Sequence, residues 1–219
     1  MAGRTLIFMG PPGSGKGTQA ASMRDRLGLV PLSSGDTLRA EIKAGSDIGR
    51  QAAQYVQAGT LVPDEIITGV MLAAVKRQPA GAGVILDGFP RTVGQAEALE
   101  QGLADAGRRV DAVIDFQIDD SLIVDRIVNR RVCKNCGATY NIRFCPPQTA
   151  DVCDRCGGTL IQRVDDREDV IRTRLATYRE QTAPLIEYYA ARGLLHRVDA
   201  AREATAVESD VAGLIEALG

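Results

Sequence analysis

The sequence contains no tryptophan, and aromatic residues make up only 4% of it. Binding platforms for single-stranded nucleic acid depend on exposed aromatic rings, so the composition disfavours this class of function. The formal net charge of −2 provides no basic surface for DNA, RNA or an anionic membrane. We therefore expect neither a nucleic acid nor a membrane as a partner.

Long hydrophobic runs are also missing. The apolar run near the N-terminus covers only residues 6–9, which is too short for a signal peptide or a membrane span and predicts a cytoplasmic protein. The chain has 219 residues, of which 45% are hydrophobic and 25% charged. These values fit one domain with a packed core and small inserts. Since no exposed apolar interface is evident, we expect a monomer.

Strand-like and helix-like segments alternate along the chain. Apolar runs at residues 83–89, 110–118 and 194–200 are typical of buried strands, as is the run before the first glycines. Helix-length segments include residues 93–106 and 121–130. This alternation predicts an α/β fold, with a parallel β-sheet flanked by helices. Ligands would lie beyond the C-terminal strand ends, where Gly10, Asp87 and Asp119 fall.

Two stretches interrupt this alternation, and we interpret both as inserts. Residues 33–62 are polar and helical, whereas residues 129–166 contain the cysteines and many turn residues. The core domain would then consist of residues 1–32, 63–128 and 167–219.

The segment GPPGSGKGT at residues 10–18 nearly matches the phosphate-binding pattern G-x-x-x-x-G-K-[ST] through Gly10, Gly15 and Lys16. It lies between a predicted strand and a predicted helix, which is the context that such a loop requires. Glycines allow backbone N–H groups to converge on phosphate oxygens, and Lys16 would bridge the terminal phosphates. We predict a phosphate loop.

The loop departs from the pattern at one position. Gly17 stands where a hydroxyl usually binds magnesium, and Thr18 follows one residue later. Mg²⁺ can be held through phosphate oxygens and water, so we predict that Asp87 binds a water of the metal. The alternative for Asp87 is a helix or turn cap.

Four of the five cysteines form two C-x-x-C pairs, which is typical of zinc held by four thiolates. These predicted ligands are Cys133, Cys136, Cys153 and Cys156. Since thiolates fill all four positions, the Zn²⁺ would be structural, in a segment with too few apolar residues to fold alone. Disulfides are the alternative. The remaining Cys145 is interpreted as a free thiol.

Phosphoryl transfer between two nucleotides gathers many negative charges, and arginine side chains stabilise such charge. Six arginines are spread over the chain as convergence on one cleft would require: Arg39, Arg91, Arg126, Arg130, Arg163 and Arg174. Arg126 and Arg130 would share one face of the predicted helix 121–130 and repel unless an anion lay between them. Taken singly, any of these arginines is more often a solvated surface charge. The sole histidine, His196, is interpreted as structural.

Several motifs resemble adenylate kinases and related nucleoside monophosphate kinases over nearly the whole chain. In order, they read GPPGSGKGTQA, SSGDTLR, LDGFPRTVGQAEAL, VDRIVNRR, RVDDREDVIRTRL and TAPLIEYY. The resemblance implies reversible transfer of the terminal phosphoryl group of Mg-ATP to AMP, giving two ADP and maintaining the adenine nucleotide balance. It also implies a P-loop kinase fold with a helical acceptor-binding insert and a zinc-ribbon-like lid that closes over the donor site.

The resemblance further implies residue roles. The catalytic residues would be Lys16, Arg91, Arg126, Arg130, Arg163 and Arg174. ATP would bind to Gly13, Ser14, Gly15, Lys16, Gly17, Thr18, Arg126, Arg130, Thr139 and Tyr140. AMP would bind to Ser34, Arg39, Thr60, Leu61, Val62, Gly88, Phe89, Pro90, Arg91, Gln95, Arg163 and Arg174. Without the resemblance, Gln95 would be assigned to an exposed helix position.

Three alternative functions differ in class or substrate. A kinase of the same fold acting on UMP or CMP is the nearest, and Gln95 and the zinc-type lid argue against it. A nucleotidase with a nucleic-acid-binding zinc ribbon would need a more basic ribbon than residues 129–166 provide. A GTPase would need an N-K-x-D base motif, which the sequence lacks.

Overall fold

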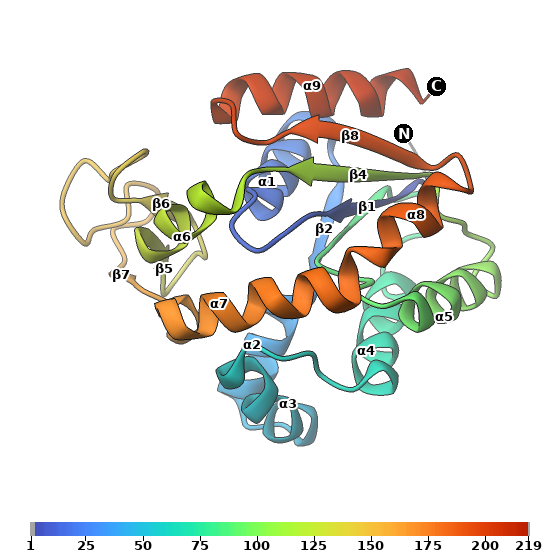
Figure 1. The fold of residues 1–219 in the computed structure, drawn as a ribbon, viewed down its shortest axis with the longest axis horizontal. Helices are drawn as coiled ribbons and strands as arrows, with labels where there is room; N and C mark the ends of the chain where they lie inside the picture. Colours follow the sequence, from blue (N-terminus) through green and yellow to red (C-terminus); the bar gives the residue numbers. More distant parts are fainter. Residues whose placement is uncertain (1–2, 219) are drawn as a thin grey trace.

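The computed structural model describes residues 3–218. Its centre is a parallel sheet with the strand order β2-β3-β1-β4-β8. Figure 1 shows β1, β4 and β8 of this sheet side by side. The strands are β1 (Thr5–Met9), β2 (Val30–Ser33), β3 (Val84–Asp87), β4 (Ala112–Gln117) and β8 (Leu195–Asp199). The predicted parallel sheet is confirmed.

One strand of this sheet was not predicted. β2 lies at an edge of the sheet and pairs only with β3. It contains Pro31, which lacks an N–H for the ladder and is tolerated mainly in edge strands. Because its four residues are only partly buried, β2 lacks the strongly apolar pattern that identified the other strands.

Helices cover both faces of the sheet. Along β1, Leu6 and Phe8 pack with α1 (Lys16–Leu27) and α9 (Ala204–Ala217), whereas Ile7 and Met9 pack on the opposite face. The opposite face is covered by α4 (Asp64–Lys76), α5 (Val93–Ala104) and α8 (Pro184–Ala190). Because all five residues of β1 are at most 3% exposed, β1 is buried on both faces, which is typical of a central parallel strand.

A helical pair follows β2. It consists of α2 (Ser34–Ala44) and α3 (Asp47–Ala58), which begin with the capping residues Ser33 and Ser46. The two helices approach so closely that a Cβ added to Gly49 would lie 2.2 Å from the Glu41 carbonyl oxygen. Glycine therefore permits this packing.

The cysteine segment forms a small antiparallel sheet between α6 (Asp120–Val128) and α7 (Glu168–Thr177). Its strands are β5 (Arg130–Cys133), β6 (Thr139–Asn141) and β7 (Leu160–Ile161), in the order β6-β5-β7. Helix α7 runs between this sheet and the α2–α3 pair (Figure 1) and leads through a π-helical turn, Tyr178–Thr182, into α8. Among residues 3–218, no helix is long and apolar enough to cross a membrane.

The predicted helix 121–130 was wrong at its C-terminal end. Helix α6 ends at Val128, and the Asn129 side chain donates to the Asp125 carbonyl oxygen at 2.8 Å. Arg130 belongs to β5, which pairs with β6. Arg126 and Arg130 therefore do not share a helix face, because pairing with β6 directs the chain into a strand.

Candidate active site

The predicted phosphate loop connects β1 to α1. Gly10 has a φ of 142°, and a Cβ at this position would lie 2.7 Å from the Phe116 carbonyl oxygen. Only glycine fits this conformation and this close approach. The N-terminal residue of α1 is preceded by Gly15, so no side chain caps the first N–H groups. These groups are available to an anion.

Lys16 folds back over the loop. Its Nζ donates to the carbonyl oxygens of Gly10 and Pro11, both at 2.8 Å, and contacts the Ser14 hydroxyl at 3.3 Å. Burial lowers the pKa of Lys16 to about 8, although Asp87 opposes this shift. The loop thus holds a partly desolvated cation.

Asp87 is the last residue of β3 and lies against the loop. A Cβ added to Gly17 would lie 3.3 Å from the Asp87 Oδ2 atom, so the glycine leaves room for this carboxylate. Burial raises the pKa of Asp87, and the nearby Lys16 charge opposes the shift. A half-buried oxygen ligand beside the phosphate loop fits Mg²⁺ bound through water. In contrast, Asp119 caps α6 by accepting from the Ser121 N–H at 2.8 Å.

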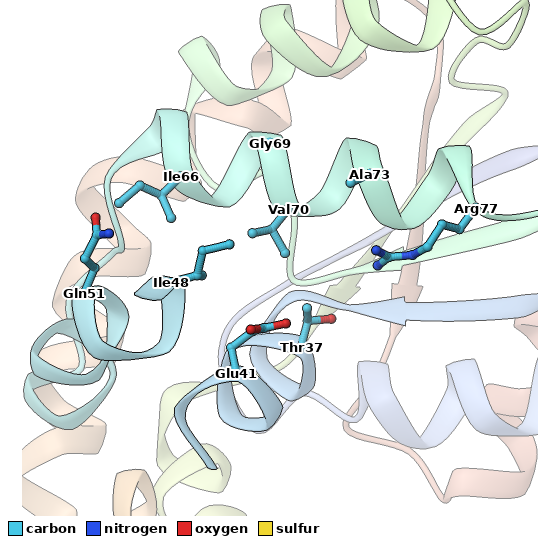
Figure 2. A pocket seen from close by; sticks show the side chains of 9 residues that line it. All are labelled: Thr37, Glu41, Ile48, Gln51, Ile66, Gly69, Val70, Ala73 and Arg77. Carbon is cyan, nitrogen blue, oxygen red and sulfur yellow. The ribbon is translucent and has the colours of Figure 1, made fainter. Parts of the chain in front are cut away.

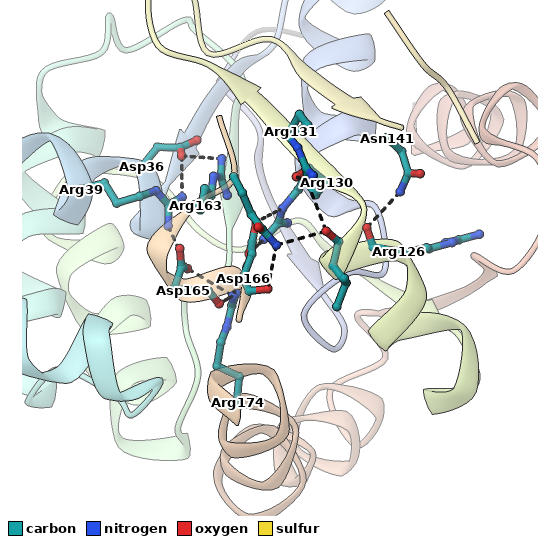
Figure 3. Close-up of polar contacts among 12 residues, drawn as sticks. Asp36, Arg39, Arg126, Arg130, Arg131, Asn141, Arg163, Asp165, Asp166 and Arg174 are labelled. Atoms are coloured by element: carbon teal, nitrogen blue, oxygen red, sulfur yellow. Dashed lines mark hydrogen bonds and ion pairs between the residues drawn. The ribbon is translucent and has the colours of Figure 1, made fainter. Parts of the chain in front are cut away.

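Four arginines and three aspartates from separate elements meet in one group, which we call the arginine cluster (Figure 3). Its members are Asp36, Arg39, Arg130, Arg163, Asp165, Asp166 and Arg174. Asp165 and Asp166 lie on a short 3-10 turn, Val164–Asp166, and both are buried. The cluster has one more positive than negative charge, which suits an anionic ligand.

Asp166 pairs with Arg130. The Arg130 Nε donates to Asp166 Oδ2 at 2.9 Å, and its Nη2 donates to the other carboxylate oxygen. Arg174 Nη1 lies 3.2 Å from Asp165 Oδ2 and 3.7 Å from Asp166 Oδ1. Burial lowers the pKa of Arg174 to about 10, which leaves it charged at neutral pH.

The other half of the cluster joins the α2–α3 pair to the segment after β7. Asp36 accepts from Arg39 at 2.6 Å and from Arg163 at 3.3 Å. Arg39 Nη1 also lies 3.5 Å from Asp165 Oδ2. Burial, together with the neighbouring Arg39 charge, lowers the pKa of Arg163 to about 10. The Asp36–Arg163 and Arg39–Asp165 pairs thus connect α2 to residues 163–165.

The three aspartates were not predicted as site residues. In the sequence, residues 129–166 were assessed only for their overall basic character, and Asp165 and Asp166 lie at the end of this segment. Their position next to Arg163, in RVDDRED, was the available signal, because buried guanidinium groups require carboxylate partners when no phosphate is bound.

Arg126 lies outside the cluster. Its guanidinium donates to the carbonyl oxygens of Ala200 at 2.9 Å and Ala201 at 3.3 Å, and it points away from Arg130 in Figure 3. Arg91 is closer to the phosphate loop, with its Nε donating to the Gly88 carbonyl oxygen at 2.6 Å. Burial lowers the pKa of Arg91, and Asp87 opposes this shift.

Gln95 is 2% exposed, so it is not a solvent-exposed helix residue. Its Oε1 accepts from the Arg91 N–H at 2.7 Å, and its Nε2 donates to Asp64 Oδ1 at 2.7 Å. Ser34 donates to the Gly88 carbonyl oxygen at 2.7 Å. The predicted acceptor residues Ser34, Gly88, Arg91 and Gln95 therefore lie together.

The remaining predicted acceptor residues differ in exposure. Phe89 and Pro90 are buried, and the Phe89 side chain packs in the core. Thr60, Leu61 and Val62 connect α3 to α4, and only Val62 is buried.

The four C-x-x-C cysteines converge. All four Sγ atoms lie within 4.8 Å of one another, with Cys133–Cys156 at 3.5 Å and Cys136–Cys153 at 3.6 Å. Four thiolates at Zn–S distances of about 2.3 Å would lie about 3.8 Å apart, so the cluster fits zinc. A disulfide requires sulfurs about 2 Å apart, and none of these cysteines forms one.

This segment also contains Tyr140, which was predicted to contact ATP, and Cys145, which was predicted to be a free thiol. The Tyr140 hydroxyl accepts from the Asp154 N–H at 2.9 Å and lies 3.5 Å from Cys153 Sγ, so the side chain faces the cysteines. Only the backbone of Tyr140 is therefore free of the cysteine cluster. The neighbouring Thr139 is exposed. Cys145 is exposed and free, as predicted.

A separate cavity of about 320 Å³ lies between α2, α3 and α4 (Figure 2). Ile48, Ile66 and Val70 line its apolar part, and Glu41 and Arg77 lie at its border. None of the predicted site residues lines it, so it is distinct from the arginine cluster and the phosphate loop.

Comparison with known proteins identifies relatives over nearly the full length. A family model described as adenylate kinase matches residues 8–194. The adenylate kinase of Syntrophotalea carbinolica is 46% identical over 214 residues, which cover 98% of each chain. That of Moorella thermoacetica is 47% identical over 92% of this chain and 93% of its own. That of Archaeoglobus fulgidus is 42% identical over 96% and 97%, respectively.

Proposed function

The chain belongs to the adenylate kinase family of phosphotransferases, and from that premise we propose that it positions ATP and AMP for transfer mainly through arginine and lysine charge. The observation that carries this proposal is the arginine cluster beside the phosphate loop. The charges of Arg91, Arg130 and Arg174 lie close enough to Lys16 to lower its pKa further. The carboxylates of the cluster occupy positions that phosphate oxygens would take.

The donor nucleotide would bind at the phosphate loop. N–H groups of residues 13–18 would donate to its β- and γ-phosphates, and Lys16 would exchange its carbonyl partners for phosphate oxygens. Arg130 would turn from Asp166 toward the same phosphates, and Arg126 would leave Ala200. The backbone of Thr139 and Tyr140 would contact the nucleoside.

The acceptor would bind between the α2–α3 pair and the core. Arg39 and Arg91 would hold the AMP phosphate, while Ser34, Gln95 and residues 60–62 would surround the base. Arg163 and Arg174 would then lie on either side of the transferred phosphoryl group. Such a group carries charge on its equatorial oxygens, which fixed guanidinium groups stabilise without reorganisation.

Mg²⁺, when bound with ATP, neutralises phosphate charge and orients the phosphates. Asp87 is the residue of this chain that would hold a water of the metal, because its half-buried carboxylate adjoins Gly17. Gly17 has no side chain to compete for that space. The same carboxylate would also limit the mobility of Lys16.

Two inserts would close over the substrates and exclude water, which would otherwise accept the phosphoryl group. Residues 129–166 would move as a lid stiffened by zinc, and residues 33–62 would close over AMP. The ion pairs of Asp36 with Arg163 and of Arg39 with Asp165 connect these two segments. Residues 1–32, 63–128 and 167–219 would form the core that carries both.

Initial rates of transfer from Mg-ATP to AMP, CMP, UMP and GMP test this function. We expect a strong preference for AMP, with two ADP formed per turnover. Comparable rates with CMP or UMP would favour a sister kinase and contradict the role of Gln95. ATP binding without transfer to any of the four would refute the kinase reaction.

A further inference from the structure

The carboxylate of Asp64 connects two helices at the acceptor side of the site. Asp64 is the first residue of α4, and its Oδ1 accepts from Gln95 Nε2 at 2.7 Å. Its Oδ2 accepts from the Thr92 hydroxyl, also at 2.7 Å. Thr92 is the N-cap of α5, on whose first turn Gln95 lies. A negative charge is favourable near a helix N-terminus, and the Asp64 carboxylate lies near the N-termini of both α4 and α5.

These contacts give the Gln95 amide one orientation. Its Oε1 accepts from the Arg91 N–H, whereas its Nε2 donates to Asp64. A half-turn of the amide would place the NH₂ group against the Arg91 N–H and the oxygen against the carboxylate. Both hydrogen bonds would be lost, because an ionised carboxylate only accepts and an N–H only donates.

An amide held in this way still has one N–H and one oxygen lone pair for a ligand. Adenine presents an amino donor at C6 beside an acceptor at N1. A 6-oxo purine presents the reverse, an acceptor at C6 beside an N1–H donor. For a base in one pose, the orientation of the amide therefore decides which purine is bound.

We propose that Asp64 is a positioning residue that sets the preference for a 6-amino base by fixing the orientation of the Gln95 amide. The proposal rests on the proposed function, in which Gln95 contacts the base of the acceptor. Asp64 need not touch the substrate to act in this way. Asp64 holds the Nε2 group of Gln95 with a side chain, whereas Arg91 holds the Oε1 atom with its backbone N–H.

A purely structural role for Asp64 makes a different prediction. Asp64 and Glu65 both lie in the first turn of α4, where a negative charge stabilises the helix. The Glu65 side chain is exposed and makes no hydrogen bond or ion pair within residues 3–218. Removing either charge would lower the melting temperature, but only Asp64 contacts the amide. Glu65→Ala is therefore a matched control.

The experiment compares kcat/KM for AMP and for IMP, a 6-oxo purine nucleotide without a 2-amino group. The variants are Asp64→Ala, Glu65→Ala, Gln95→Ala and the double variant of Asp64 and Gln95, with the KM for ATP and the melting temperature measured for each. We expect Asp64→Ala to reduce the AMP:IMP ratio roughly tenfold, because one charge-assisted hydrogen bond enforces the orientation. The KM for ATP and the ratio in Glu65→Ala should not change. In the Gln95→Ala background, removal of Asp64 should have no further effect on the ratio.

The experiment distinguishes failure of the positioning role of Asp64 from failure of the base contact of Gln95. If Gln95→Ala changes the ratio but Asp64→Ala leaves it within about twofold, the positioning role is overturned and the function stands. If Gln95→Ala itself leaves the ratio unchanged, the proposed base contact is wrong, and the inference fails with it. Asp64→Asn preserves the side-chain shape should the alanine variant not fold. Its amide can accept from or donate to Gln95, so this variant should also reduce the ratio.

Discussion

Replacing Asp166 with asparagine removes one buried negative charge from the arginine cluster while preserving the shape of the side chain. The Asp166 side chain is 0% exposed, and that of its partner Arg130 is 17% exposed. The substitution leaves Arg130 without its partner carboxylate, whereas Arg174 keeps its ion pair with Asp165. It also places an NH₂ group against one of the guanidinium groups that Asp166 now accepts from.

Breaking a buried ion pair costs about 3–5 kcal/mol of unfolding free energy, because one charge is left uncompensated. Arg130 keeps some solvent contact, so we expect about 3 kcal/mol, at the lower end of this range. For a chain of this size, such a loss lowers the melting temperature by about 6–12 °C.

The assay is thermal unfolding, with and without inorganic tripolyphosphate. Because the cluster of the variant has a larger excess of positive charge, the polyanion should raise its melting temperature more than that of the unchanged protein. Asp169→Asn is the control, since Asp169 pairs with Arg167 at 3.4 Å and both side chains are at least 66% exposed. A surface pair of this kind contributes less than about 1 kcal/mol.

The reasoning would be refuted if Asp166→Asn melted like Asp169→Asn. It would also be refuted if tripolyphosphate stabilised the Asp166 variant no more than the unchanged protein. The first result would mean that the cluster tolerates excess positive charge without a ligand. The second would mean that the carboxylates do not occupy phosphate positions.

Two further predictions concern Lys16 and the cysteines. The pKa of Lys16 in the folded protein is about 8, below its ordinary value of 10.5. Burial of the ammonium therefore lowers the free energy of unfolding below pH 8, and this loss disappears as the pH rises toward 10.5. We therefore expect kcat/KM for ATP to fall above about pH 8. The kcat should persist to higher pH, because bound phosphates raise the pKa of Lys16. A kcat/KM profile that stays flat well above pH 8 would contradict this expectation. Purified protein should contain about one zinc per chain, and chelation should lower both the melting temperature and the turnover. Loss of the metal without either change would disprove the stiffening role, and Cys145→Ser, a substitution outside the cluster, should leave the metal content intact.

The elements defined by local chemistry were predictable from the sequence. The phosphate loop was evident because glycines and a lysine at this fixed spacing are typical of only a few loop conformations. The two C-x-x-C pairs were evident because thiolate spacing reflects the metal that it binds. The central strands were recognisable because burial on both faces requires a continuous apolar run.

The less evident features depend on partners far away in the sequence. Pairing of β5 with β6 ends α6 at Val128 and separates Arg130 from Arg126. The edge strand β2, with its proline and its partial burial, has no strong local pattern.

Residue type and spacing alone thus sufficed to identify the phosphate loop, the group of four cysteines, the parallel core and the set of arginines. Only the tertiary structure decided which arginines meet, that Asp36, Asp165 and Asp166 neutralise them, and that Asp64 holds the Gln95 amide. Among these contacts, that of Asp36 with Arg163 spans 127 positions and that of Asp64 with Gln95 spans 31 positions. The physical reason is that a buried charge takes its partner from whichever element packs beside it, and packing of distant elements is not encoded in local spacing.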